Sequence, residues 1–174
     1  MPLLLARRDQ QGLNLFELLI VLSIIVVLTL LALPSFIDFT QEYRVTATTQ
    51  NLYYALQYAR SEAIKRNQNI YVTFSTTDPW CYGINVGSAC TCTTPSSCTL
   101  GTGGASKTND MTLTTRGLSG NSLIFEGSRG AASSGASLLT LTVNGQTTAM
   151  GINVTVLGNM QMCSAQVSGY PVCT

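Results

Sequence analysis

The sequence contains no histidine, and only 10% of its 174 residues carry a charge, against about 25% in a typical domain. Without histidine there is no Ser-His-Asp or Cys-His relay and no imidazole to hold a metal ion. Nine Lys and Arg against eight Asp and Glu give a net charge of +1, which is too little to attract nucleic acid or anionic lipid without a local patch. We therefore expect a protein that is not an enzyme and that binds no cofactor.

One apolar run dominates the N-terminal part of the chain. The twenty residues from Leu18 to Ile37 include no charged side chain. A helix rises about 1.5 Å per residue, so this run is about 30 Å long, which matches the hydrocarbon core of a bilayer. A core helix of a water-soluble domain would have one polar face, whereas here every face is apolar. The run predicts a transmembrane helix.

The residues around this run predict its orientation. Arg7 and Arg8 precede it, and by the positive-inside tendency they keep the N-terminus in the cytoplasm. An ordinary secretory signal has a shorter apolar region and a cleavage site with small residues, whereas this run continues through Leu33, Pro34 and Ser35. We therefore expect a single-pass inner-membrane protein with residues 38–174 in the periplasm.

Glu17 lies directly before the apolar run. A carboxylate at this depth is costly and by default marks a function that involves a partner of opposite charge. The chain has no Lys or Arg for many turns after it, but cleavage after Gly12 would create an α-amino group on Leu13, four residues away. The two groups can pair within one chain or between packed chains.

The residues Gln11-Gly12-Leu13-Asn14-Leu15-Phe16-Glu17-Leu18-Leu19-Ile20 resemble the leader of type IV pilins and type II secretion pseudopilins. The resemblance implies that a prepilin peptidase removes residues 1–12 by cutting after Gly12, and that Leu13 is then N-methylated. It also implies that Glu17 docks each subunit against the N-terminus of its neighbour in a filament. Pro34 matches a proline that is common in these helices, and because it removes one backbone donor it should kink the long helix or loosen it locally. The family usually has Phe and Thr after the cut, where this chain has Leu13 and Asn14.

A second helical pattern follows the apolar run. Leu52, Leu56, Ala59 and Ala63 recur at intervals of four, three and four residues, which places them on one helix face. We expect residues 13–37 to form the membrane or filament-core helix and residues 38–69 its amphipathic continuation, ended by Asn67 to Asn69. The segment Leu56-Gln57-Tyr58-Ala59-Arg60-Ser61-Glu62-Ala63-Ile64-Lys65-Arg66-Asn67 is similar to the branch that includes the type II secretion pseudopilin H and the minor pilins FimT and FimU.

From Ile70 the apolar period changes to two. Short segments rich in β-branched or aromatic residues predict antiparallel strands at 70–75, 82–86, 122–126, 138–143 and 152–156. Asn144-Gly145 is typical of a hairpin turn. One long helix followed by consecutive strands predicts an α+β fold, with the helix packed on an antiparallel β-domain over residues 70–174. The resemblance makes this fold pilin-like.

Six cysteines lie in the predicted periplasmic domain, where the compartment is oxidising. Cys81, Cys90, Cys92 and Cys98 lie in an insertion over residues 81–107, and Cys163 and Cys173 lie near the C-terminus. We expect Cys163 to pair with Cys173 and the other four to form two bridges, without a bond between Cys90 and Cys92. The alternative, a zinc site with four thiolates, fits neither the usual CxxC spacing nor the compartment. Accordingly, no metal is expected.

Gly101 to Thr108 approaches the pattern of a phosphate-binding loop, but Ser106 stands in place of the last glycine. No buried strand is predicted before it, so a flexible loop is the better interpretation.

In the branch named above, FimT is linked to DNA uptake through a basic G-R-x-R motif. The corresponding residues here are Gly158-Asn159-Met160-Gln161, which include no arginine. The motif therefore does not support nucleic acid as a partner.

These observations predict a minor pilin that initiates or caps assembly of a type IV pilus. The alternatives are a pseudopilin at the tip of a type II secretion pseudopilus and a pilus-tip subunit that binds DNA or a surface through the insertion. The expected partners are the prepilin peptidase, other minor pilins or pseudopilins, the major pilin, and the inner membrane before assembly. Both kinds of filament use the same leader and helix, so the sequence leaves the choice between them open.

Overall fold

The computed structural model describes residues 14–104, 111–118, 120–133, 135–143 and 148–173, with the side chains of 30–38, 95 and 143 left out of that description. The chain divides into two compact units, Met1–Phe39 and Thr40–Thr174. The predicted cleavage site at Gly12 and Leu13 and the hairpin turn at Asn144-Gly145 lie outside the described residues.

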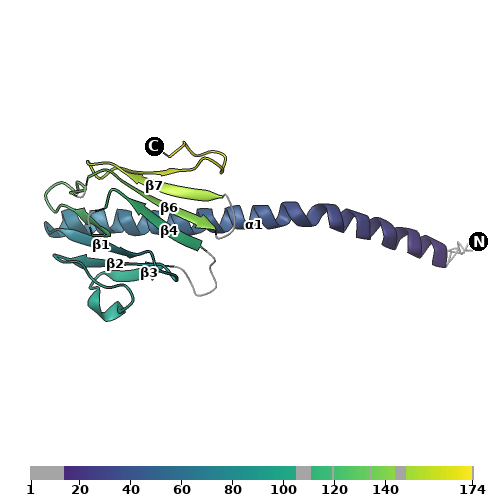
Figure 1. Ribbon diagram of the computed structural model, residues 1–174, viewed down its shortest axis with the longest axis horizontal. Coiled ribbons are helices and arrows are strands. Elements are labelled where there is room, and N and C mark those ends of the chain that lie inside the picture. The colour runs from purple at the N-terminus through teal and green to yellow at the C-terminus, as the bar shows by residue number, and fades with distance from the viewer. Residues whose placement is uncertain (1–13, 105–110, 119, 134, 144–147, 174) are drawn as a thin grey trace, which may run out of the picture. The chain divides into compact units, whose positions relative to one another are not determined.

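Helix α1 spans Leu15–Arg66 and passes through Pro34 (Figure 1). Asn14 directly precedes the helix, and its carbonyl oxygen accepts hydrogen bonds from the amide groups of Glu17 at 3.0 Å and Leu18 at 3.2 Å. No helix in the described part of the chain has the length and hydropathy needed to span a membrane. The side chains from position 30 onward in the predicted span, with Pro34 among them, lie outside the described residues, so both the span and the kink stay predictions.

The C-terminal end of α1 agrees with the predicted boundary at Asn67. Asn67 adopts a positive φ of 50°, a left-handed conformation that asparagine tolerates better than most residues. Its amide donates to the Ile64 carbonyl at 3.3 Å, and the Gln68 amide donates to the Ala63 carbonyl at 3.2 Å. This pair of bonds is a Schellman motif, which stops the helix and turns the chain into the first strand.

Two four-stranded antiparallel sheets follow the helix. One has the order β3-β2-β1-β5 and the other β4-β6-β7-β8. The strands span β1 Ile70–Ser75, β2 Cys81–Val86, β3 Gly101–Gly104, β4 Met111–Arg116, β5 Ser122–Phe125, β6 Ser137–Val143, β7 Ala149–Val154 and β8 Met160–Cys163, with a short 3-10 helix η1 at Pro95–Ser97. The α+β class is therefore confirmed, and the β-domain consists of two sheets.

The structure corrects the strand prediction in two respects. The predicted strand 152–156 begins earlier, at Ala149, and ends at Val154 because the chain turns at Thr155. There the Gly158 amide donates to the Thr155 carbonyl at 2.8 Å, and Gly158 has a φ of +77°. Strands β3, β4 and β8 were not predicted. Of these, only β4 has a clear alternation, with Met111 and Leu113 buried and Thr112 and Thr114 exposed.

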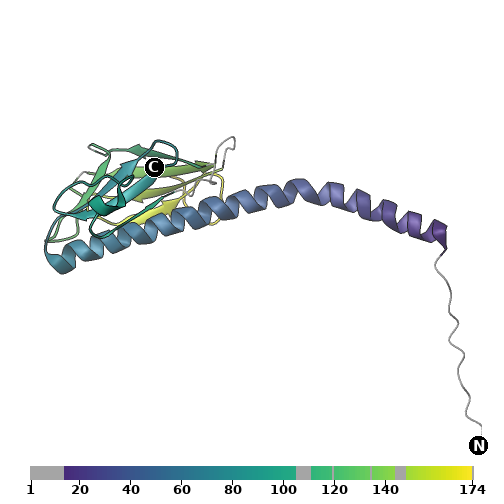
Figure 2. The same ribbon diagram turned by 90° about the horizontal axis from the view of Figure 1, so that it is seen from below.

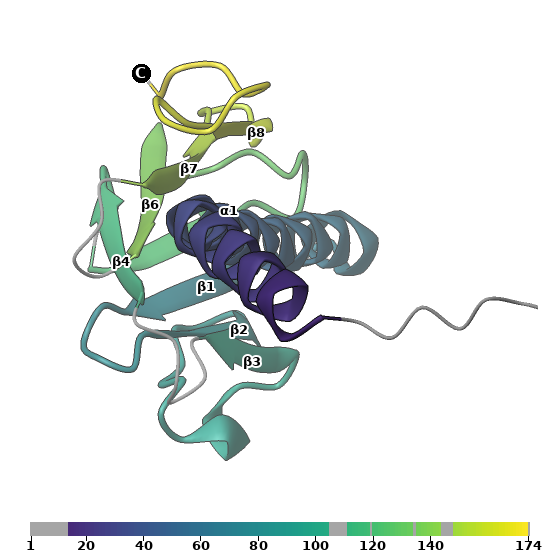
Figure 3. The same cartoon turned by 90° about the vertical axis from the view of Figure 1, so that its right-hand side faces the viewer.

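Within residues 40–174, both sheets lie on the same side of α1 (Figures 2 and 3). The predicted stripe of Leu52, Leu56, Ala59 and Ala63 is completely or almost completely buried against the strands. The core they join includes Trp80, Phe125, Leu139, Leu141 and Ile152. Burial of apolar surface contributes about 25 cal/mol per Å². The burial of this stripe is therefore the main interaction that stabilises the packing of the helix on the sheets.

Candidate functional site

The apolar start of α1 is the first candidate site. From Leu15 to Leu28, every large apolar side chain is between 46% and 78% exposed, and Glu17 is the acidic residue of the first turn. A carboxylate in that position interacts favourably with the positive end of the helix dipole. The start of α1, from Leu15 to Leu28, therefore exposes apolar side chains on all its faces, with one acidic residue in its first turn.

A row of tyrosines lies on the side of α1 that faces away from the sheets. Tyr43, Tyr54 and Tyr58 are 68%, 65% and 44% exposed, and at 100° per residue they point opposite to the buried Leu52 and Leu56. Tyr54 packs edge to face with Tyr53 at a ring separation of 5.9 Å. We call Tyr43, Tyr54 and Tyr58 the tyrosine face. The tyrosine face was not predicted from sequence, although the spacing of residues 43, 54 and 58 places them on one side of a helix.

The basic residues near the end of α1 have protein partners. The Arg60 guanidinium donates to the carbonyl oxygens of Gly130 at 3.1 Å and Leu157 at 3.3 Å, and so ties the helix to two loops. Arg66 Nε donates to Glu62 at 2.6 Å and Lys65 Nζ donates to it at 3.3 Å. All three basic side chains therefore have specific partners within the fold.

Glu62 is 6% exposed, which is unusual for a carboxylate in a protein with so few charges. The hydrogen bond from Arg66 lowers the pKa of Glu62 below its ordinary value of 4.5; burial opposes this shift, and the bond and charge of Lys65 support it. The group is therefore an anion at neutral pH and helps to fix the last turns of α1.

The turn that corresponds to the G-R-x-R position is apolar at its tip. Val156 and Leu157 are 57% and 71% exposed and line an open pocket of about 480 Å³ next to Ala131 and Ala132. Among the described residues that line this pocket, the charged ones are Glu126 and Arg129, whose side chains lie 3.9 Å apart. Since Arg60 and Arg66 are also engaged, the geometry does not favour phosphate binding here.

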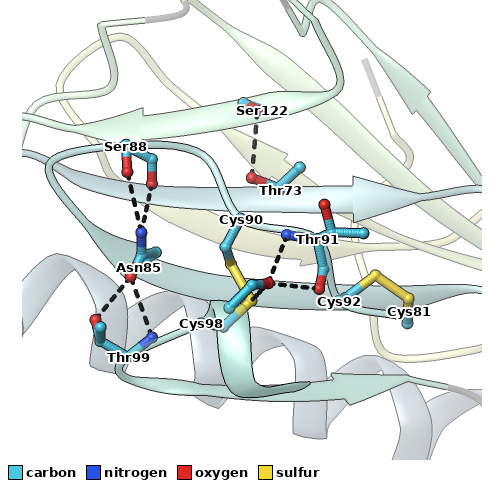
Figure 4. Close-up of a disulfide and its surroundings, with 11 residues drawn as sticks. Thr73, Cys81, Asn85, Ser88, Cys90, Thr91, Cys92, Cys98, Thr99 and Ser122 are labelled. Atoms are coloured by element: carbon cyan, nitrogen blue, oxygen red, sulfur yellow. Dashed lines mark hydrogen bonds between the residues drawn. A yellow bond between two sulfur atoms is a disulfide. The ribbon is translucent and has the colours of Figure 1, made fainter. Parts of the chain in front are cut away.

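The predicted insertion is held by two bridges, Cys81–Cys92 and Cys90–Cys98 (Figure 4), and a third bridge joins Cys163 to Cys173. Cys163 and Cys173 pair as expected, and Cys90 and Cys92 do not bond to each other. The four cysteines that a zinc site would need are all oxidised. Within the described residues, no group of acidic and cysteine side chains could hold a metal ion.

The two bridges of the insertion pack against β2. A side chain at Gly83 would collide with the sulfur atoms of both Cys90 and Cys98. Buried Asn85 completes the anchorage, because its Oδ1 accepts from the Thr99 amide at 3.1 Å and from the Thr99 hydroxyl at 2.7 Å, while its Nδ2 donates to the Ser88 carbonyl at 3.0 Å. Local hydrogen bonds and disulfides therefore fix the insertion to the sheet.

Two kinds of comparison relate this chain to known proteins. Residues 48–158 match the model of the family described as type II transport protein GspH. The structure is similar to the type IV minor pilin FimU of Pseudomonas aeruginosa strain PAO1, with a TM-score of 0.58, 19% identity, and coverage of 74% of this chain and 97% of FimU. It is also similar to the minor pseudopilin EpsH from the Type 2 Secretion System of Vibrio cholerae, with a TM-score of 0.52, 15% identity, and coverage of 71% and 98%. No curated protein matches the sequence.

The long capped helix and the two antiparallel sheets thus define a pilin-like α+β fold. The family match spans more than half of the chain. The protein belongs to the family described as type II transport protein GspH.

Proposed function

We propose that this protein is a minor pilin that initiates or caps the assembly of a type IV pilus. One observation carries the proposal: the described start of α1 exposes apolar side chains on every face, from Leu15 to Leu28. Exposed apolar surface costs about 25 cal/mol per Å² in water. Such a helix needs lipid or other apolar helices around it, and a filament core built from related helices supplies the second environment.

The life cycle follows from this requirement. Before assembly, the apolar run Leu18 to Ile37 is held in the inner membrane, with residues 38–174 in the periplasm. The prepilin peptidase removes residues 1–12 by cutting after Gly12, and the new N-terminus on Leu13 is methylated. The helix then passes from the bilayer into the filament without exposure to water. Support comes from the absence of charge in that run and from the family membership.

Glu17 guides this transfer. In a filament core of low polarity, its carboxylate has no Lys or Arg nearby in its own sequence, so the α-amino group of a neighbouring subunit is the partner that removes the cost of the buried charge. The carboxylate also interacts favourably with the positive N-terminal end of its own helix, which stabilises the charged group by about 0.3–1 kcal/mol. That contribution is too small to hold a charge in an apolar environment unaided.

The tyrosine face supplies a second contact surface. Tyr43, Tyr54 and Tyr58 present large aromatic areas with hydroxyl groups on the exposed side of α1, opposite to the buried Leu52 and Leu56. Tyrosine is enriched where proteins contact one another, because it combines apolar area with a polar tip. In the filament this face lies against neighbouring helices.

The central experiment follows subunits carrying Glu17→Ala or Glu17→Gln from the membrane to sheared filaments. Both variants should insert into the membrane and lose their leader normally, yet be absent from the filament fraction. The matched control is Glu42→Ala, which removes an acid from the same helix outside its first turn. Incorporation of the Glu17 variants at wild-type levels would contradict the proposal.

A pseudopilin at the tip of a type II secretion pseudopilus is the second candidate. It is favoured by the description of the matching family as a transport protein and by the likeness to EpsH. Deletion of the gene separates the two candidates. Loss of surface pili with normal secretion supports the pilus role, whereas retention of exoproteins with intact pili supports the secretion role.

A further inference from the structure

The outer surface of the insertion is uncharged and rich in hydroxyl groups. No Asp, Glu, Lys or Arg occurs between Asp78 and Lys107. Cys90, Cys92 and Cys98 are buried, while the threonines and serines between them are exposed. Thr99, directly after Cys98, is exposed as well. We call these exposed residues the hydroxyl face; it comprises Thr91, Thr93, Thr94, Ser96, Ser97 and Thr99.

These hydroxyl groups divide into two sets by their bonding. The Ser97 hydroxyl donates to the Thr91 carbonyl at 2.9 Å and accepts from the Thr91 amide at 3.0 Å, and the Thr99 hydroxyl donates to Asn85. Ser97 and Thr99 therefore hold the loop together. The side chains of Thr91, Thr93, Thr94 and Ser96 have no hydrogen-bond partner among the described residues and are exposed. Of these four residues, Thr93, Thr94 and Ser96 lie within two residues of Pro95, between Cys92 and Cys98.

The backbone that carries these three residues is fixed. Thr93, Thr94 and Ser96 lie between Cys92, which is bonded to Cys81, and Cys98, which is bonded to Cys90 (Figure 4). The Thr94 amide donates to the Thr91 carbonyl at 3.0 Å, and the Ser97 amide donates to the Thr94 carbonyl at 2.9 Å. The bridges and these backbone hydrogen bonds thus restrain the backbone that carries the three hydroxyl groups. The three side chains are exposed and make no hydrogen bond with the described residues.

Two uses of such a surface can be compared. Noncovalent binding of a sugar normally needs an aromatic or other large apolar side chain as a platform, and the described residues of the insertion expose none. Covalent attachment needs only an accessible hydroxyl group. A segment of Thr and Ser around a proline, here Thr93-Thr94-Pro95-Ser96, is the composition found where O-linked sugars are attached. The surface therefore favours attachment over binding.

We propose that the insertion is an O-glycosylation site, with the sugar attached to one or more of Thr93, Thr94 and Ser96. In the reaction, the hydroxyl oxygen attacks the anomeric carbon of a phosphate-activated sugar donor. A new carbon–oxygen bond forms, the bond from that carbon to the phosphate breaks, and the phosphate leaves with the electron pair. The hydroxyl proton passes to a base of the glycosyltransferase. The proposal depends on the proposed function only in that the insertion lies outside the cytoplasm.

The experiment uses the full mature chain, purified in detergent from the organism in which it occurs naturally. Its intact mass should exceed the mass of the oxidised, N-methylated polypeptide from Leu13 onward by whole hexose or N-acetylhexosamine units. Peptide fragmentation should locate them between Cys92 and Cys98. The variant Thr93→Val/Thr94→Val/Ser96→Ala should lose the added mass completely, while the control Ser168→Ala, an exposed hydroxyl elsewhere, should keep it.

Two further measurements keep the result unambiguous. The six cysteines of the triple variant should resist alkylation without reductant, because its bridges do not depend on these hydroxyl groups. An unmodified mass for the wild-type chain would overturn the proposal, as would a sugar that persists in the correctly bridged triple variant. Filament incorporation is measured on the same samples, so that failure of glycosylation is distinguished from failure of the assembly role.

Discussion

Removal of the C-terminal disulfide by Cys163→Ala/Cys173→Ala is expected to destabilise the β-domain without unfolding the loop that the bridge closes. The loop has other anchors. The Ser164 hydroxyl donates to the Ala149 carbonyl at 2.7 Å and accepts from the Val167 amide at 2.9 Å, and the Ser164 amide donates to the Pro171 carbonyl at 2.8 Å. Val167 is buried. The native loop therefore persists, and the main loss is the restriction that the bridge places on the unfolded chain.

The size of the loss follows from the length of the closed loop. For a sequence separation of 10, loop-closure entropy gives about 2.7 kcal/mol at 25 °C. The separations of 11 and 8 in the insertion give about 2.8 and 2.5 kcal/mol by the same relation. The three bridges should therefore contribute almost equally, although they lie in different parts of the fold.

The assay is urea unfolding of the full chain in nonionic detergent, followed by fluorescence. The single tryptophan, Trp80, is 2% exposed and reports on the core of the β-domain. With a urea dependence of about 2 kcal/mol per molar, the midpoint should fall by about 1.3 M. The exposed Ser168→Ala variant within the same loop should not shift it. A decrease of more than about 5 kcal/mol in the free energy of unfolding, or a urea midpoint equal to that of the wild type, would contradict the explanation that the bridge acts mainly by restricting the unfolded chain.

Three further predictions concern the leader, the core and pH. Gly12→Asp should block leader removal, which appears on a gel as a band that does not shift; a band shifted as in wild type would refute the cleavage assignment. Leu56→Ala truncates a fully buried side chain and should reduce the free energy of unfolding by about 2–5 kcal/mol, and an effect below about 1 kcal/mol would contradict the burial of the stripe. Glu62→Gln should destabilise the fold most at neutral pH. Because the pKa of Glu62 is lowered in the folded state, its stabilisation is present above the ordinary value of 4.5 and is lost as pH falls through that value and then the lowered one. The difference between wild type and Glu62→Gln in urea midpoint should therefore shrink in acid, and a difference independent of pH would show that the ion pairs are not its origin.

Elements with a strong local pattern could be predicted from sequence. The stripe from Leu52 to Ala63 repeats with helical spacing, and strand β1 alternates along its whole length, so both were located within a residue or two. Strand β3 consists of three glycines and a threonine, which provide no alternation. It exists because β2 pairs with it. The division of the strands into two sheets likewise depends on contacts between residues far apart in the chain.

The candidate sites divide in the same way. The short separation of Cys163 and Cys173 made their pairing predictable, whereas four nearby cysteines allowed more than one arrangement until β2 positioned Cys81 next to Cys92. The roles of Arg60 and Glu62 were not predictable either, because their partners or their burial depend on the packed fold.

The sequence by itself determined the long helix, its apolar first part with Glu17, the buried stripe and the alternating strands, since each depends on periodicity or charge over a few neighbouring residues. Tertiary structure alone decided the two-sheet arrangement, the pairing of the first four cysteines, the loops held by Arg60 and the outward position of the hydroxyl face. These features arise when residues far apart in sequence are brought together, and the hydrophobic effect that drives this packing is non-directional, so local patterns do not specify its partners.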